Sequence, residues 1–139
     1  MTEKVNITKV IDAPSADVWA SIEGIDGLDR WFPVIDSCKV EGDGVGAMRT
    51  MEVAGGGRIV DRVAEIDAGA RRFRYERLEF PLPVQSYVGT VLVQTAGDQT
   101  AVSWTIEMDV DPKDRDEITN FVKNAISDGI SGLEAELRR

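Results

Sequence analysis

The N-terminal part of the chain begins with alternating apolar residues and then changes to helical spacing. The alternation covers residues 3–12 and is typical of a half-buried strand. After Pro14, which suits the first turn of a helix, apolar residues recur three to four positions apart; they are Val18, Trp19 and Ile22. The pattern predicts a strand, a helix that ends at Gly24 and a second short helix over residues 26–31.

Residues 34–110 consist of short stretches with the two-residue period of β-strands. The expected strands cover residues 34–41, 47–53, 58–66, 71–79, 84–95 and 100–110. Segments rich in glycine and aspartate separate them, and connections this short favour antiparallel hairpins. Consecutive strands are therefore predicted to be neighbours in one sheet.

The last element is predicted to be a long amphipathic helix that begins at Asp111 and Pro112, as a cap and a first-turn proline. Its apolar positions are Ile118, Phe121, Val122, Ala125, Gly129, Ile130, Leu133 and Leu137. Gly129 and Gly132 are unusual, because each costs roughly 1 kcal/mol relative to alanine within a helix. They either allow close packing on the sheet or leave room for a ligand.

This order of elements predicts an α+β fold in a single domain over residues 1–139. The first strand is followed by two short helices and then by six strands, whose consecutive hairpins form a strongly curved antiparallel sheet, and the apolar stripe of the last helix is expected to cover its concave face. One helix does not fill such a concavity completely. We therefore expect an internal cavity between the sheet and the C-terminal helix.

The alternation also predicts which side chains point into the concavity. On the last strand they are Val102, Trp104, Ile106, Met108 and Val110. In residues 47–53 the apolar set of Ala47, Met51 and Val53 carries Arg49 with it. In residues 71–79 the set begins with Phe73 and Tyr75, and in residues 84–95 it contains Tyr87, Gly89, Val91 and Val93. Residues 58–66 are ambiguous, because Ile59, Asp61 and Val63 compete with Val60, Ala64 and Ile66.

The inner wall is thus apolar with a few polar groups, which are Arg49, Tyr75, Tyr87 and, on one of the two assignments, Asp61. Such a wall is typical of a small-molecule site, although the same residues also suit a plain core. A buried unpaired guanidinium is costly, so Arg49 either pairs with a carboxylate such as Asp61 or lies in water at the strand end. The tyrosines either contact a ligand or hydrogen-bond to the backbone.

Composition narrows the possible functions. The net charge of −9 argues against nucleic-acid binding, and no stretch reaches the ~20 apolar residues of a membrane span, so we expect no membrane insertion. The absence of histidine excludes Ser-His-Asp and Cys-His catalysis. The single cysteine, Cys38, cannot form an intramolecular disulfide or a cysteine-based metal site. We expect a cytoplasmic monomer or weak homodimer without metal or cofactor.

Two glycine-rich segments resemble phosphate-binding motifs but fail on their context. Residues 42–47 match GxGxxA, yet a strand follows them where a dinucleotide site requires a helix. The run Gly55, Gly56 and Gly57 lacks the lysine and serine of a phosphate-binding loop, so we interpret it as a mobile hairpin tip.

Several segments, in the same order along the chain as in the family, resemble the START-like helix-grip superfamily, and in particular the bacterial polyketide cyclase/dehydrase and lipid-transport family. They are Ile11-Asp12-Ala13-Pro14, Asp17-Val18-Trp19, Trp31-Phe32-Pro33, Gly44-Val45-Gly46-Ala47-Met48-Arg49, Asp61-Arg62-Val63 with Asp67, Tyr75 and Tyr87. This family shares its fold with the birch-pollen allergen and the plant abscisic-acid receptors. The resemblance implies a seven-stranded antiparallel sheet that grips the C-terminal helix around a hydrophobic cavity.

The resemblance also implies where a ligand binds. In the receptor branch, the positions that match Asp61, Tyr75 and Tyr87 line the pocket, and the entrance loops correspond to residues 54–58 and 80–84. The loop residues here are Gly55, Gly56, Gly57, Pro81, Leu82 and Pro83. The receptor lysine that binds the hormone's carboxylate falls at about Asp36, which argues against abscisic acid. The predicted ligand-binding residues are Trp31, Phe32, Arg49, Met51, Ile59, Asp61, Tyr75, Tyr87, Trp104, Phe121 and Ala125.

Three functions are compatible with these residues. The first is binding of a small hydrophobic or amphipathic molecule, lipid-like or polyketide-like, in the cavity. The second is a cofactor-independent polyketide cyclase, aromatase or dehydratase, with Tyr75 or Tyr87 as acid, Asp61 as base and Arg49 holding an enolate oxygen. The third is a protein-interaction module whose acidic surface meets a basic partner.

Overall fold

A computed structural model describes residues 2–139 and has the predicted order of elements. The helices are α1 (Ser15–Glu23), α2 (Leu28–Trp31) and α3 (Arg115–Leu137). The strands are β1 (Thr2–Ile11), β2 (Ile35–Glu41), β3 (Met48–Val53), β4 (Arg58–Asp67), β5 (Arg72–Glu79), β6 (Val84–Ala96) and β7 (Gln99–Val110). Every strand that the sequence pattern predicts is present, and its ends differ from the predicted ones by no more than a few residues.

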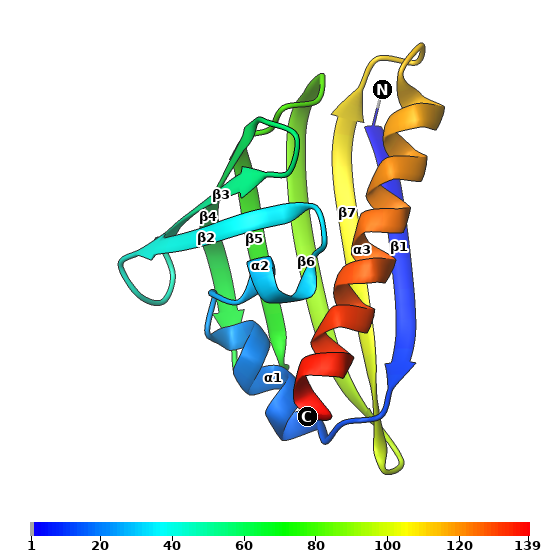
Figure 1. Cartoon of the computed structure of the whole chain (residues 1–139). Helices are drawn as coiled ribbons and strands as arrows, with labels where there is room; N and C mark the ends of the chain where they lie inside the picture. The colour runs from blue at the N-terminus through cyan, green and yellow to red at the C-terminus, as the bar shows by residue number, and fades with distance from the viewer. Residues whose placement is uncertain (1) are drawn as a thin grey trace.

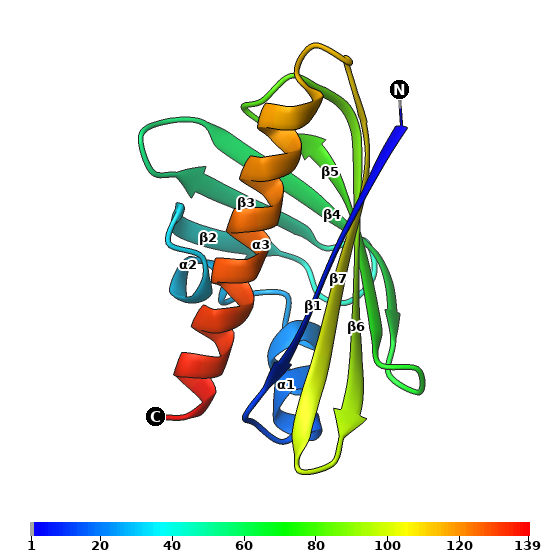
Figure 2. The ribbon, with the colours of Figure 1, turned by 90° about the vertical axis from the view of Figure 1, so that its right-hand side faces the viewer.

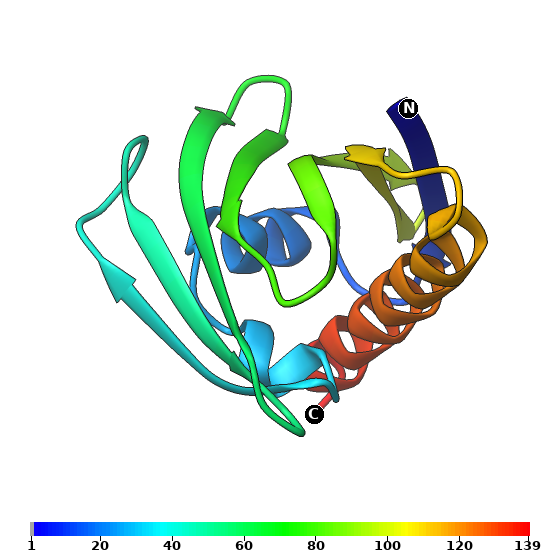
Figure 3. The same cartoon turned by 90° about the horizontal axis from the view of Figure 1, so that it is seen from above.

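The seven strands form one antiparallel sheet in the order β1-β7-β6-β5-β4-β3-β2 (Figure 1). The six strands from β2 to β7 are a meander, and β1 joins it at the β7 edge. Seen from above, the sheet curves around a concave side that α3 closes (Figure 3). This is the helix-grip arrangement, and it confirms the predicted α+β fold.

The long helix α3 spans the concavity from one edge of the sheet toward the other. It packs against β1 and β7 on one side and against α2 on the other, rather than against the middle strands of the sheet (Figure 2). Contact with the β1 edge of the sheet and with α2, rather than along the middle strands, explains how a 139-residue chain keeps an internal cavity.

Burial confirms the predicted inner face on most strands. The inward side chains of β7, from Val102 to Val110, are all at most 3 % exposed. Arg49 lies inside with Met51, as the apolar parity of β3 requires. The ambiguous strand β4 contains a bulge between Val63 and Glu65, so Ile59, Asp61 and Val63 point inward before it. After the bulge, Ile66 pairs with the inward Phe73, so each of the two competing assignments describes part of the strand.

The beginning of α3 differs from the prediction. The backbone N–H of Asp114 donates to the carbonyl oxygen of Asp111, and the Asp111 carboxylate accepts the N–H of Lys113. These bonds form a separate turn, so α3 begins at Arg115 rather than directly after Pro112. Asp111 therefore stabilises this turn and does not cap the helix.

The two glycines of α3 allow close packing, but their partner is α2 and not the sheet. A Cβ atom at Gly129 would overlap the ring of Phe32, and one at Gly132 would overlap the carbonyl oxygen of Trp31. The absence of these two side chains lets α2 and the residue after it lie directly against α3. Phe32 is thereby held in place as part of the interior wall.

Candidate functional site

A cavity of about 330 Å³ lies between α3 and the concave face of the sheet. Its walls come from α2, from every strand between β2 and β7, and from the first half of α3. The lining is almost entirely apolar or aromatic, and Arg77 is its one charged residue within the described residues 2–139. A space of this size and character lies at the lower end of the about 300–1,000 Å³ typical of ligand pockets.

Most of the predicted ligand-binding residues line this cavity: Phe32, Ile59, Tyr75, Tyr87, Trp104, Phe121 and Ala125. Four others lie outside its lining, namely Trp31, Arg49, Met51 and Asp61. Trp31 and Arg49 border a void of only about 10 Å³ next to it. These four residues are all buried, so the structure places them behind the wall rather than in it.

The two predicted entrance loops meet at the rim of the cavity. Gly56, Pro81 and Leu82 line it, whereas Gly55, Gly57 and Pro83 do not. Gly57 has φ +107°, and a Cβ atom there would lie 2.8 Å from Cβ of Pro81, so a glycine is needed for the loops to touch. On α3, Phe121 lines the cavity and is 41 % exposed, so it also lies where the cavity meets the solvent.

Strand pairing places three charged side chains in a row on the inner face of three neighbouring strands. Arg49 on β3 is opposite Asp61 on β4, and Asp61 is opposite Arg77 on β5. Nη2 of Arg49 donates to Oδ2 of Asp61 at 3.0 Å. Arg77 donates from Nε to Oδ1 at 2.8 Å and from Nη2 to Oδ2 at 3.3 Å. Of the two readings of Arg49, the pairing with Asp61 is the one observed.

The electrostatics of this row keep Asp61 ionised. Burial raises the pKa of its carboxyl group, but the charges and hydrogen bonds of Arg77 and Arg49 outweigh that effect, so the pKa lies below its ordinary value. Both carboxylate oxygens are occupied by guanidinium groups, and the side chain is completely buried. A general base must reach the proton that it removes, so this geometry does not suit the base role considered for Asp61.

The sequence reasoning missed the one charged lining residue, Arg77, and several apolar ones, which are Leu28, Val34, Ile35, Val53, Phe80, Val122 and Ile126. Arg77 occupies the same parity as Phe73 and Tyr75, so the alternation of β5 contained the signal. Its guanidinium carbon lies 4.3 Å from the ring centroid of Tyr87 and 5.1 Å from that of Phe80. These contacts are in the range of cation–π interactions and hold the guanidinium group in the cavity wall.

The two tyrosines are neutral hydrogen-bonding groups at neutral pH. Burial raises the pKa of Tyr75, and burial together with the neighbouring Tyr75 raises that of Tyr87 well above its usual value. Nε1 of Trp104 donates to the Tyr75 hydroxyl at 3.1 Å, so the partner of this hydroxyl is a side chain rather than the backbone. Gly89 faces Tyr75 across the β5–β6 pair, and any Cβ atom there would overlap the tyrosine ring.

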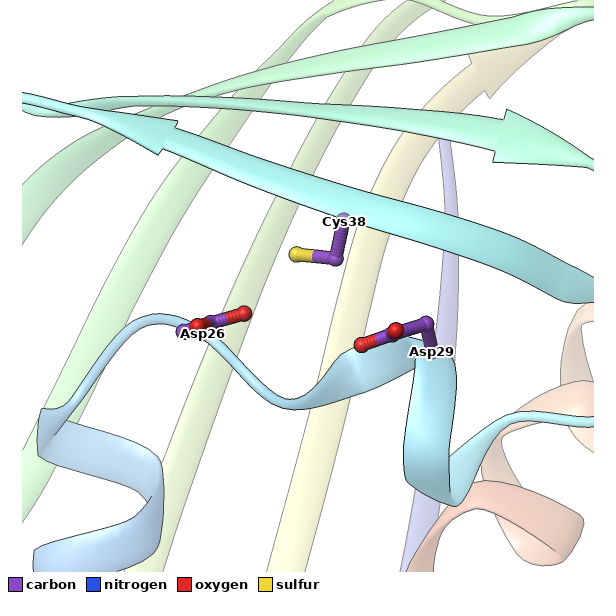
Figure 4. A group of neighbouring side chains, drawn as sticks. All are labelled: Asp26, Asp29 and Cys38. Atoms are coloured by element: carbon purple, nitrogen blue, oxygen red, sulfur yellow. The ribbon is translucent and has the colours of Figure 1, made fainter.

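Three potential metal ligands lie together outside the cavity lining, between the start of α2 and β2. The side chains of Asp26, Asp29 and Cys38 come within 4.8 Å of one another (Figure 4). Burial, together with both aspartates, raises the pKa of the Cys38 thiol to about 11, although Arg49 opposes this. Asp26 is exposed, and acidic side chains at a protein surface commonly lie together without an ion, so we assign no metal to this cluster.

No helix within residues 2–139 combines the length and the apolar character needed to cross a bilayer. α3 is long enough, but it carries acidic and basic side chains along its outer face.

Comparison with known proteins gives a family and several structures of the same fold. Residues 2–138 match the model of the family described as polyketide cyclase / dehydrase and lipid transport. A search of the curated proteins finds no significant match. A protein from Nitrosospira multiformis is 27 % identical with a TM-score of 0.80, and the alignment covers 99 % of this chain and 100 % of that one.

Two structures of named enzymes share the fold at lower identity. The Zhui aromatase/cyclase from Streptomyces sp. R1128 is 19 % identical with a TM-score of 0.87, covering 100 % of this chain and 95 % of that one. Norcoclaurine synthase from Thalictrum flavum is 16 % identical with a TM-score of 0.82, covering 100 % and 88 %. At these identities the likeness concerns the fold alone. The family match over nearly the whole sequence carries the assignment, and the chain belongs to the polyketide cyclase / dehydrase and lipid transport family.

Proposed function

We propose that this protein binds a small hydrophobic or amphipathic molecule in the cavity between the sheet and α3. Proteins of this family bind hydrophobic ligands or act as cyclases. The observation that carries the proposal is the cavity of about 330 Å³, whose lining is apolar apart from one arginine and the polar groups of Tyr75, Tyr87 and Trp104.

The residues that contact the ligand, on this proposal, belong to two groups. Phe32, Ile59 and Trp104 form a rigid apolar wall, and Phe32 meets the Trp104 ring edge-to-face at a centroid distance of 5.5 Å. Phe121 and Leu82 lie on the rim, where a ligand has to pass. A preformed wall with a more exposed rim favours reversible binding without a large change in the sheet.

A cyclase activity receives less support from the geometry. Its chemistry needs a base that reaches the substrate, and the one internal carboxylate among residues 2–139, Asp61, is engaged by two arginines behind the wall. The raised pKa values of Tyr75 and Tyr87 make both hydroxyls weak acids at neutral pH. We therefore place ligand binding first.

Mass spectrometry tests the proposal directly. The full chain is measured under native conditions and again after denaturation, and a discrete excess mass that is lost on denaturation supports a bound small molecule. If the protein is purified empty, the neutral hydrophobic probe N-phenyl-1-naphthylamine is titrated by fluorescence, and its effect on the melting temperature is recorded. If the protein binds neither a native ligand nor this probe, the proposal is wrong.

A matched pair of substitutions locates the binding. Ala125 lines the cavity from α3, whereas Ala135 is exposed on the same helix outside it. Ala125→Phe fills part of the cavity and should abolish probe binding, while Ala135→Phe should leave it unchanged. Equal effects of the two substitutions would place the probe somewhere other than the cavity.

A further inference from the structure

We propose that the cavity selects ligands that carry one anionic group on a hydrophobic body, and that Arg77 binds this group. The inference rests on the proposed ligand-binding function and adds to it the chemical class of the ligand. It follows from the charges behind and in the cavity wall, which do not cancel.

The row of charged residues has a net charge of +1, since two guanidinium groups share one carboxylate. Arg49 and Asp61 are 2 % and 0 % exposed, and the Arg77 side chain is 8 % exposed. A charge with so little access to water is costly unless an opposite charge lies near it. No carboxylate lines the cavity within residues 2–139, so an anionic ligand is the group that completes the pairing.

The excess charge can reach a ligand only through Arg77. Arg49 is tied down on both terminal nitrogens, because Nη1 donates to the carbonyl oxygen of Ile25 and Nη2 donates to Asp61. Arg77 lines the cavity and uses Nε and Nη2 for its bonds to Asp61. Its remaining nitrogen, Nη1, is therefore the donor available to a ligand oxygen.

The position of this donor is fixed before a ligand arrives. Asp61 holds the guanidinium group with two hydrogen bonds, and the rings of Tyr87, Phe80 and Tyr75 surround it at 4.3, 5.1 and 5.5 Å from the guanidinium carbon. A pre-organised arginine loses little entropy on binding an oxygen anion. Tyr75 and Tyr87 also line the cavity, and their raised pKa values keep both hydroxyls neutral, so they add no negative charge beside Arg77.

The ligand class follows from this arrangement. A carboxylate, phenolate, enolate or sulfonate on a body of apolar carbon atoms matches both the arginine and the apolar wall. A neutral analogue gains the apolar contacts but leaves the charge of Arg77 unpaired. A cationic analogue is repelled. The protein as a whole is acidic, with a net charge of −9, so any preference for anions has to come from this site rather than from the surface.

Two fluorescent probes with the same ring system test the inference in the full chain. 1-Anilinonaphthalene-8-sulfonate carries an anionic group, and N-phenyl-1-naphthylamine lacks it. We expect Arg77→Met to weaken sulfonate binding by about tenfold or more, as for loss of a charged hydrogen bond, and to change binding of the neutral probe by less than about threefold. An unchanged ratio of the two affinities would overturn the inference.

The matched control is Arg62→Met, which removes the same charge from the neighbouring strand but from its outer face, where Arg62 pairs with Glu76. This control should leave both affinities unchanged, and a loss equal to that of Arg77→Met would refute a local effect. Folding of each variant is checked by circular dichroism and thermal melting.

A second experiment needs no substitution and therefore holds even if Arg77→Met does not fold. The wild-type protein is loaded with the neutral probe, which is displaced with dodecanoate, 1-dodecanol or dodecylamine. We expect dodecanoate to bind most tightly and dodecylamine most weakly; any order in which the anion is not the tightest contradicts the inference. If the neutral probe itself does not bind, it is the proposed function that fails, and the two failures are thus distinguishable.

Discussion

Replacing Asp61 with asparagine is the sharpest test of the charged row, because it removes the carboxylate and changes little else in shape. In the variant, Arg49 on β3 and Arg77 on β5 flank a neutral amide on β4 in the core. The amide can accept with its oxygen, but its NH₂ group faces donors. Two buried guanidinium groups then lack a counter-charge.

The structure allows the cost to be estimated. Asp61 accepts hydrogen bonds at 2.8, 3.0 and 3.3 Å, and its side chain is 0 % exposed. Breaking a buried ion pair by removing one partner costs about 3–5 kcal/mol. The free energy of unfolding of a whole protein is about 5–15 kcal/mol, so this loss is a large fraction of it. For a chain of this length the melting temperature should fall by roughly 10–20 °C.

The pH dependence gives an independent check on the sign. The pKa of Asp61 is lowered in the folded protein, so the stabilisation is complete above the pKa of the unfolded chain, about 3.9, and is lost as pH falls through the folded pKa. The difference in stability between wild type and Asp61→Asn should be constant from pH 8 to about pH 5 and should shrink below about pH 4.

Urea denaturation and thermal melting at several pH values provide the measurement. The control is Glu79→Gln, which breaks the pair between Arg58 and Glu79 at the surface, where both side chains are about half exposed. It should leave the melting temperature nearly unchanged. A fall of only a degree or two for Asp61→Asn, equal to that of the control, would refute the claim that the row is a buried electrostatic unit.

Three further predictions concern single residues. Gly129→Ala places a methyl group on the Phe32 ring, so we expect about 1–3 kcal/mol of destabilisation, measured by urea denaturation, and weaker probe binding, measured by fluorescence. Unchanged values of both would contradict the close packing of Gly129 on Phe32. Gly89→Ala should displace the Tyr75 ring and lower the melting temperature, which a thermal melt tests, whereas a stable variant would show that the ring moves freely. Cys38, with its pKa raised to about 11, should react with iodoacetamide at pH 7.5 on the order of a hundredfold more slowly than a free thiol; a rate near that of free cysteine would contradict its burial.

The architecture could be predicted because each strand and helix carries its own local pattern. β7 alternates without interruption, and α3 has an apolar stripe along its whole length, so both were predicted from periodicity alone. The start of α3 is predicted too early, at Asp111, because an aspartate followed by proline is equally compatible with a turn and with a helix cap. The partner of Gly129 was also missed, since contacts between α2 and α3 depend on the closure of the sheet.

The candidate site was harder to predict because its chemistry lies between strands. The face of Asp61 was uncertain, because the bulge after Val63 reverses the alternation of β4 and a one-residue shift moves every later side chain to the other face. Arg77 shares the inward parity of Phe73 and Tyr75, which separates it from Arg72 and Arg74, but its pairing with Asp61 depends on the register between β4 and β5, which the alternation along one strand does not give.

Pairing of the strands resolves both uncertainties at once. An inward arginine on β3 demands an inward carboxylate on its neighbour, and Asp61 satisfies this demand only when β4 has the observed register. Arg49 donates to the Asp61 carboxylate from one guanidinium nitrogen, so the two carboxylate oxygens can accept from a second donor. The other neighbour of β4 is β5, so in this register the second donor comes from β5. Of the inward positions there, Arg77 is the cation opposite Asp61. One buried charge, followed across the sheet strand by strand, therefore leads to the residue that lines the cavity and carries the excess charge.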